Sequence, residues 1–353
     1  MLNTRNRGTT STSNGFAAVR ANGVIKSEKL QDNYSVQDIS GVSSVIIPKI
    51  RKQVMKFRQY WCEVAMMAGM ASLCLCGCVN CGQFGERDYT SQDELPRLEA
   101  LVFKSEGSDI YGQVLVPSSQ FKGGRPCAII CHGFAGFTRW DDVAHDLCRA
   151  GIVVVIPHHR GAWGSEGEYT VSGCIRDAEN LARWTRGADF AAKYQTDTNA
   201  VYLIGHSMGG NSVVNAAARM GGVKGVALIA PCDIGFMSEQ MRRDELTRFL
   251  IGEGLHVLHR ASDEAVVDDI ERNAASMRFS RAAKSLAGVR VFLATGEYDM
   301  VVPTKPLDLF WDALPNDGAL RIRKSYRATH SLMGCRRALA RDLAEFIWAH
   351  LRF

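Results

Sequence analysis

The chain has 353 residues, which is enough for one large domain with an extension or for two modest domains. Hydrophobic residues make up 46% of it and charged residues 22%, which excludes a wholly disordered chain and a chain embedded throughout in a membrane. The net charge of +5 is spread along the sequence and does not form a block, so we expect no nucleic-acid partner.

The first part of the chain differs in composition from the rest. Residues 1–54 are rich in Ser, Thr, Asn and Gly, so we expect a disordered or non-native extension there. Residues 55–81 begin with basic side chains and continue with an apolar run from Val64 to Val79. That run is short for a membrane span and suits the core of a signal peptide.

Leu75-Cys76-Gly77-Cys78 resembles a bacterial lipobox, in which the last cysteine becomes the lipidated first residue of the mature protein. On this interpretation Met55 is the true start, and the protein is exported or lipid-anchored in the cell envelope through residues 55–81. Glu63 and Cys76 do not fit the pattern. The alternative is an amphipathic or buried helix leading into the domain of a cytoplasmic protein.

Eleven cysteines raise the question of a metal or disulfide framework. The group from Cys74 to Cys81 has no matching His or Cys pair at zinc spacing, so we expect no metal site. The later cysteines lie in apolar strand and helix patterns and are expected to be buried thiols. These are Cys127, Cys131, Cys148, Cys174, Cys232 and Cys335.

From residue 98 onward, strand and helix patterns alternate. The segments Leu98–Lys104 and Ile110–Val116 predict an antiparallel hairpin. Compact apolar runs predict strands buried on both faces at Cys127–Cys131, Ile152–Ile156, Val201–Ile204, Val223–Ile229 and Val289–Ala294. Helical spacing occupies Asp141–Ala150, Val171–Tyr194, Met208–Met220 and the final stretch Ser331–Leu351. This alternation predicts an α/β fold with a mostly parallel sheet flanked by helices.

A long helical stretch interrupts the alternation between Ala230 and Gly288. It includes predicted helices over Ser238–Leu258 and Asp263–Met277, and we expect residues of about 231–288 to form a helical cap over the mouth of the sheet. Apolar side chains available to shape a pocket there are Phe236, Met237, Met241, Phe249, Leu250, Leu255 and Leu258.

Ser207 stands in Gly205-His206-Ser207-Met208-Gly209, between a predicted strand and a predicted helix. The glycines are needed because the turn is tight and larger side chains would clash with the adjacent strand and helix. Such a turn exposes the serine hydroxyl at a helix N-terminus, where developing negative charge is stabilised. We therefore predict that Ser207 is a catalytic nucleophile.

A serine nucleophile requires a base and a carboxylate that orients the base. Asp299 lies in the loop directly after a predicted strand, and His330 lies just before the last predicted helix. We predict that His330 is the base and Asp299 the acid, with Glu297 as the alternative acid. His158 and His159, like His206 beside the serine, are expected to be structural.

An acyl-transfer site also needs hydrogen-bond donors for the oxyanion. We predict the backbone N–H of Met208, directly after the nucleophile, and that of Phe134. Phe134 lies in the loop that follows the predicted strand Cys127–Cys131, where Gly133 allows the backbone to turn toward the site.

Over residues 98–353 the chain resembles the α/β-hydrolase superfamily. The similarity rests on His-Gly-Phe, Gly-His-Ser-Met-Gly-Gly, Gly-Glu-Tyr-Asp-Met-Val-Val-Pro and Thr-His, which occur in the family's order. It implies an α/β-hydrolase fold with a sheet of the eight-stranded type and a catalytic domain spanning residues 82–353. The segment Arg160–Gly167 resembles a supporting loop of esterases, with Trp163 in place of a glycine and His158 where many relatives have Asp. Trp163 is expected either to line the pocket or to pack against it.

The resemblance to feruloyl esterases and carboxylesterases implies hydrolysis of a small-molecule ester through an acyl-enzyme on Ser207, with no metal or organic cofactor. A peptidase or aminopeptidase similar to the prolyl-oligopeptidase group is the alternative. Those enzymes usually carry a large N-terminal propeller, for which the segment before residue 98 is short. A non-catalytic binding protein on this fold would lack a member of the triad.

Overall fold

The structure is a computed structural model, and it describes residues 88–349. The predictions for residues 1–54 and 55–81, including the lipobox and its crowded cysteines, lie outside the described residues. Export or anchoring through that segment therefore stays a prediction. The described helices include none that is long and apolar enough to cross a membrane.

Within residues 88–349, eight strands form one sheet in the order β1-β2-β4-β3-β5-β6-β7-β8. The first three strands in this order are antiparallel neighbours, and all later neighbours are parallel. The strands are β1 (Arg97–Ser105), β2 (Ser108–Val116), β3 (Arg125–Cys131), β4 (Val153–Pro157), β5 (Thr196–His206), β6 (Gly225–Ile229), β7 (Arg290–Gly296) and β8 (Arg321–Tyr326). The mostly parallel sheet predicted from the alternation of patterns is confirmed.

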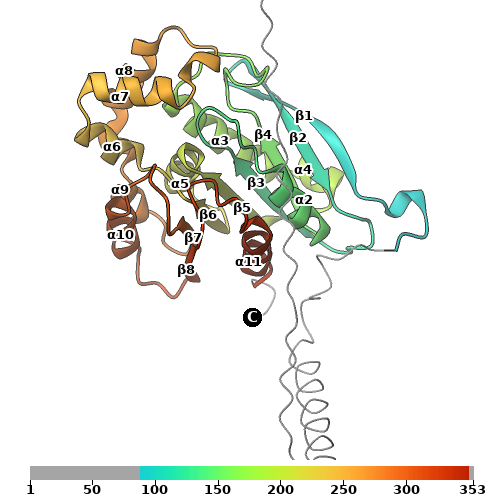
Figure 1. Ribbon diagram of the computed structural model, residues 1–353. Helices are drawn as coiled ribbons and strands as arrows, with labels where there is room; N and C mark the ends of the chain where they lie inside the picture. The colour runs from blue at the N-terminus through green and yellow to red at the C-terminus, as the bar shows by residue number, and fades with distance from the viewer. Residues whose placement is uncertain (1–87, 350–353) are drawn as a thin grey trace, which may run out of the picture. The chain divides into compact units, whose positions relative to one another are not determined.

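The central strands are apolar on both faces because both faces are covered. In β3, Cys127 and Ile129 pack into one core cluster, while Ala128 and Ile130 pack into another on the opposite face. The helices α2 (Asp141–Arg149) and α11 (Arg336–Trp348) cover the second cluster. The first cluster is covered by α3 (Val171–Thr185), α4 (Ala188–Tyr194), α5 (Met208–Met220) and α10 (Lys305–Asp312), as Figure 1 shows.

Several predicted helix boundaries are wrong. The predicted helix Val171–Tyr194 is divided into α3 and α4, because Gly187 adopts an extended conformation between them. The last helix begins at Arg336 and not at Ser331, because Leu332 and Gly334 have positive φ angles of 49° and 87° that a helix does not accommodate. The helix α10 was not predicted.

The segment between β6 and β7 contains α6 (Ile234–Gln240), α7 (Arg243–Gly252), a short 3₁₀ turn η2 (Leu255–Val257), α8 (Asp263–Met277) and α9 (Phe279–Ala283). The predicted continuous helix Ser238–Leu258 is wrong, because Met241 is extended and Gly254 has a φ of 102°. The helices α6, α7 and α8 lie together at one side of the sheet (Figure 1).

Buried polar contacts attach this segment to the rest of the domain. The Asp269 carboxylate accepts hydrogen bonds from the backbone N–H of Ser172, at 2.9 Å, and from the Ser172 hydroxyl at the start of α3. The backbone of His259 donates to Gly161 O at 2.7 Å and accepts from Tyr169 N at 2.8 Å. The segment is therefore fastened both to α3 and to the loop after β4.

The six cysteines among the described residues are free thiols; Cys335 is partly exposed and the other five are buried. Burial raises the pKa of Cys131 and Cys148 to about 12, so these thiols are poor nucleophiles and poor metal ligands. Residues 88–349 contain no group of three His, Cys, Asp or Glu side chains that could hold a metal ion.

Two glycines allow a test of the turn between β5 and α5. A Cβ on Gly209 would collide with the carbonyl oxygens of Cys131 and His132, whereas a Cβ on Gly252 in α7 would meet no atom within 4 Å. We expect Gly209→Ala to lower the free energy of unfolding by about 2 kcal/mol or more. The matched change Gly252→Ala should leave it unchanged or raise it by up to ~1 kcal/mol. Urea denaturation measures the free energy of unfolding of both variants. Equal effects would contradict the claim that the carbonyl groups of Cys131 and His132 exclude a side chain at Gly209.

Candidate active site

Ser207 lies at the sharp turn between β5 and α5. Its φ of 53° and ψ of −120° are strained for a residue with a side chain. The backbone around it holds this conformation: Ser207 N donates to Ile229 O at 3.0 Å, and Ser207 O accepts from Cys232 N at 3.0 Å. The serine is therefore fixed at the carboxyl edge of the sheet, at the start of α5.

His330 and Asp299 meet although 31 positions separate them. His330 Nδ1 lies 2.8 Å from Asp299 Oδ2, and both side chains are largely shielded from solvent. The other carboxylate oxygen of Asp299 accepts the N–H of Val301 at 2.9 Å and that of Val302 at 3.2 Å. Burial raises the pKa of Asp299, but these hydrogen bonds outweigh burial and lower the pKa below its ordinary value. Asp299 is thus held as a carboxylate beside the imidazole.

The alternative acid, Glu297, does not take part in this arrangement. Its carboxylate is partly exposed and faces the guanidinium of Arg327, with 4.0 Å between Oε2 and Nε. Of the two candidate carboxylates, the structure brings Asp299 to His330 and leaves Glu297 at the surface.

His206 supports His330 from behind. Its Nε2–H donates to the backbone carbonyl of His330 at 3.1 Å, and its ring packs between Trp140 and the His330 ring. Burial lowers the pKa of His206 to about 3, and the neighbouring His330 adds to this effect. His206 is therefore neutral and positions the loop that carries His330. The sequence indicated a structural histidine here but not which residue it supports.

The loop after β3 supplies the second predicted donor. Among the described residues, neither the N–H of Phe134 nor that of Met208 donates to an acceptor of the protein. His132 holds this loop, because its Nδ1–H donates to Gly133 O at 2.8 Å and its Nε2 accepts from His159 N at 3.2 Å. Both donors therefore remain available at the edge of the site.

Trp163 braces the same loop. Its indole N–H donates to Ala135 O at 3.3 Å, and its ring contacts Phe137 edge to face. Its side chain is 48% exposed and does not line the pocket beside Ser207. Of the two predicted roles for Trp163, packing against the loop is the one that the structure favours.

A small pocket that opens to solvent contains Ser207 and His330 together. No hydrogen bond joins the Ser207 hydroxyl to His330 in the described part of the chain; such contacts often tighten only when substrate binds. The remaining lining residues are mostly apolar: Phe134, Val171, His206, Met208, Cys232, Ile234, Phe249, Leu250, Glu253 and Val301. Of the apolar cap residues noted in the sequence, Phe249 and Leu250 reach this pocket, while Met237, Leu255 and Leu258 are buried in the core.

Comparisons with known proteins agree with this architecture. A family model described as serine aminopeptidase, S33, matches residues 124–251. Est1E from Butyrivibrio proteoclasticus, solved with ferulic acid bound, is similar with a TM-score of 0.56 and 18% identity, covering 72% of this chain and 100% of that one. The protein has the α/β-hydrolase fold.

Two further structures share the α/β-hydrolase fold with this chain. An acetyl xylan esterase from Paenibacillus sp. R4 has a TM-score of 0.55 and 13% identity over 74% of this chain and 86% of its own. The Pyrococcus furiosus esterase Pf2001 has a TM-score of 0.52 and 14% identity over 74% of this chain and 94% of its own. At these identities the similarity establishes the fold.

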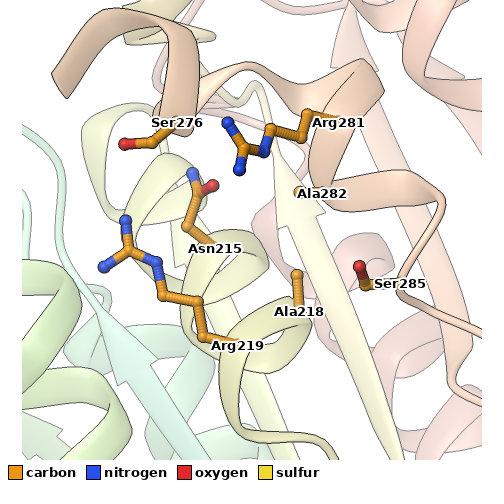
Figure 2. A pocket seen from close by; sticks show the side chains of 7 residues that line it. All are labelled: Asn215, Ala218, Arg219, Ser276, Arg281, Ala282 and Ser285. Carbon is orange, nitrogen blue, oxygen red and sulfur yellow. The ribbon is translucent and has the colours of Figure 1, made fainter.

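Another hollow of this α/β-hydrolase fold lies between α5, α8 and α9, and Figure 2 shows the side chains around it. It is lined by Asn215, Ala218, Arg219, Ser276, Arg281, Ala282 and Ser285. These lining residues include serines but no histidine or carboxylate that could activate one of them. The candidate reaction site is therefore the pocket that contains Ser207.

The buried histidines predict how stability depends on pH. The folded-state pKa is about 3 for His206 and about 4 for His159, both lowered chiefly by burial, so the unfolded chain binds protons first as the pH falls below about 6.5. Their depressed pKa values therefore make the free energy of unfolding fall as the pH is lowered from about 6.5 toward 4.

Urea denaturation of His206→Gln between pH 5 and 6 isolates one of these groups. Gln retains a donor for the His330 carbonyl, and removal of the buried imidazole should reduce the slope of unfolding free energy against pH by up to ~1.4 kcal/mol per pH unit. The control is His145→Gln, which changes an exposed histidine on α2. An unaltered slope in His206→Gln would mean that His206 is not held neutral by the fold.

Proposed function

We propose that this protein is a serine hydrolase that cleaves small carboxylic esters through an acyl-enzyme on Ser207. The observation that carries the proposal is the contact of 2.8 Å between His330 Nδ1 and Asp299 Oδ2, because His330 lines a pocket that also contains the strained Ser207. Nucleophile, base and orienting carboxylate are the three parts that acyl transfer to serine requires.

In the proposed first step, Ser207 Oγ attacks the carbonyl carbon of the ester. His330 Nε2 takes the hydroxyl proton as the Oγ–C bond forms, and the carbonyl π electrons move to its oxygen. The free N–H groups of Phe134 and Met208 stabilise that oxyanion. When the tetrahedral intermediate collapses, the bond to the leaving alcohol breaks and His330 gives this alcohol its proton.

The second step returns the enzyme to its starting state. A water molecule attacks the acyl carbon while His330 Nε2 takes one of its protons, and collapse then releases the carboxylic acid and reprotonates Ser207. Asp299 keeps the imidazole in the tautomer with the proton on Nδ1 and stabilises the imidazolium that forms in each step. The low pKa of Asp299 supports this role because the carboxylate stays ionised throughout.

The lining of the pocket favours the binding of an ester with an apolar acyl or alcohol part. Phe134, Val171, Ile234, Phe249 and Leu250 form most of its wall. The solved structures of similar fold reported above are described as an esterase, an acetyl xylan esterase and Est1E with ferulic acid bound, which supports ester chemistry. Peptide hydrolysis by an aminopeptidase is the second candidate, because the matching family model is described as a serine aminopeptidase.

The nucleophile is tested by replacing Ser207 with alanine in the full chain. We expect the wild type to hydrolyse p-nitrophenyl esters of graded chain length or methyl ferulate, and Ser207→Ala to lose at least about 10³-fold in kcat because no acyl-enzyme can form. The rate of release of p-nitrophenolate or ferulate measures the activity of the wild type and of Ser207→Ala. Turnover of aminoacyl-p-nitroanilides alone would favour the aminopeptidase, and turnover that survives in Ser207→Ala would refute the proposal.

The assignment of the acid is tested by a pair of isosteric changes. Asp299→Asn keeps the shape of the side chain but stabilises the wrong tautomer of His330, so we expect kcat to fall by roughly 10²–10⁴-fold. Glu297→Gln should change kcat less than about threefold, because its carboxylate faces Arg327 and not the imidazole. Ester hydrolysis at pH 7 to 8 measures both variants, and the opposite ranking would assign the acid to Glu297.

A further inference from the structure

Glu253 places a carboxylate in the pocket that contains Ser207 and His330. It lies directly after α7 and is half-buried. It is the single carboxylate among the residues that line this pocket, and that lining includes no Lys or Arg. The proposed ester hydrolysis does not use it.

The backbone N–H of Glu253 donates to Phe249 O at 2.9 Å, but no contact of its carboxylate within the described residues explains where that carboxylate lies. Its carboxylate takes part in no hydrogen bond and no ion pair there, whereas most other acids of the segment between β6 and β7 are paired. Glu253 is also the C-cap residue of α7, where the last carbonyl groups carry partial negative charge, and the last turn of α7 contains no basic residue. A carboxylate at this end of a helix is locally unfavourable.

Three carboxylates act on Cys232, a thiol in the wall of this pocket. Burial raises the pKa of this lining thiol to about 12, and the carboxylates of Asp233, Asp299 and Glu253 all act in the same direction. Asp233 and Asp299 are each held by backbone N–H groups, and Asp299 also by His330, so neither is free to bind a ligand. Of these three carboxylates, Glu253 is the one available to bind a positively charged group of a ligand.

We propose that Glu253 is a specificity-determining residue that binds an ammonium group of the substrate. Esters with a positively charged acyl or alcohol part are then preferred over neutral esters of the same shape. This inference rests on the proposed ester hydrolysis at Ser207. The apolar walls formed by Phe134, Phe249 and Leu250 would enclose the alkyl groups around the charge.

The test uses two pairs of esters in which a carbon replaces the charged nitrogen. Butyrylcholine and 3,3-dimethylbutyl butyrate differ in the charge of the alcohol part. Alanine ethyl ester and ethyl isobutyrate differ in the charge of the acyl part. The ratio of kcat/KM for the charged ester to that for its neutral partner isolates recognition of charge. The two pairs together distinguish a quaternary ammonium from a primary amine.

For the full-length wild type we expect a ratio of at least ten in one pair, and in Glu253→Gln a fall of that ratio by about tenfold. The matched control is Glu264→Gln, which removes the same charge from an exposed position on α8 and should leave the ratio unchanged. Circular dichroism and the Tm establish that each variant is folded. Glu253→Asp, which keeps the charge on a shorter side chain, should recover part of the ratio.

The outcomes separate this inference from the proposed function. Ratios near one in both pairs, or a ratio that persists in Glu253→Gln, would overturn the role of Glu253 while neutral ester hydrolysis still supports the serine esterase. Absence of turnover for all four esters and for p-nitrophenyl esters would overturn the esterase itself. If Glu253→Gln does not fold, competitive inhibition of the wild type by tetramethylammonium and by ethylammonium decides, with substrate held below its KM. The lack of inhibition by both cations at up to about 100 mM would refute the ammonium site.

Discussion

The close approach of backbone to backbone at the start of α5 determines where the reactive groups can be. Gly209 lies so near the carbonyl groups of Cys131 and His132 that no side chain fits between them. Strand β5 must therefore turn into α5 within one residue, and Ser207 takes the strained conformation of that turn at a cost of roughly 1–3 kcal/mol. The contacts of Ser207 with Ile229 and Cys232 hold the turn in place. The Cα–Cβ bond of Ser207 and the first free N–H of α5 thus have fixed directions before any ligand binds.

Neutral histidines also hold the loops beside this turn in place. His132 uses one ring nitrogen as a donor and the other as an acceptor, which only the neutral imidazole can do. Burial keeps the pKa of His132 and of His159 well below the ordinary value, so both remain neutral at physiological pH. His330, by contrast, lies beside a carboxylate at the pocket. Histidine therefore has a structural role at His132 and His159 and is a candidate base at His330, because the burial and the neighbours of these side chains differ.

Local sequence patterns were sufficient to predict much of the fold and part of the candidate site. The apolar runs predicted the central strands because those strands are buried on both faces, and the residues around Ser207 predicted the turn because its glycines are required locally. The choice between Asp299 and Glu297 could not be made from spacing, since both lie in one loop. It depends on the N–H groups of Val301 and Val302, which turn Asp299 toward His330.

The break between α3 and α4 and the place of Glu253 could not be predicted from the sequence pattern. The helical pattern of Val171–Tyr194 continues through Arg186 and Gly187, and nothing in it marked the extended conformation that Gly187 adopts between the two helices. Glu253 gave no signal, because it stood inside the predicted helix Ser238–Leu258, where a glutamate is usually exposed to water. Its place in the pocket follows from the end of α7 at Gly252 and from the way the segment between β6 and β7 folds back over the site.

The attachment of that segment separates two kinds of change that mutation can make. Asp269 on α8 and the backbone of His259 fasten it to the domain. The helix α7 carries Phe249 and Leu250, is followed directly by Glu253, and comes before both fastenings in the chain. The proposed catalytic residues Ser207, Asp299 and His330 follow instead the ends of β5, β7 and β8. Substitution of the side chains at the end of α7 that face the pocket can therefore change what the pocket admits without altering the turn at Ser207. This wall is also a target for directed evolution, since Phe249 and Glu253 can be varied while Ser207, Asp299 and His330 stay unchanged.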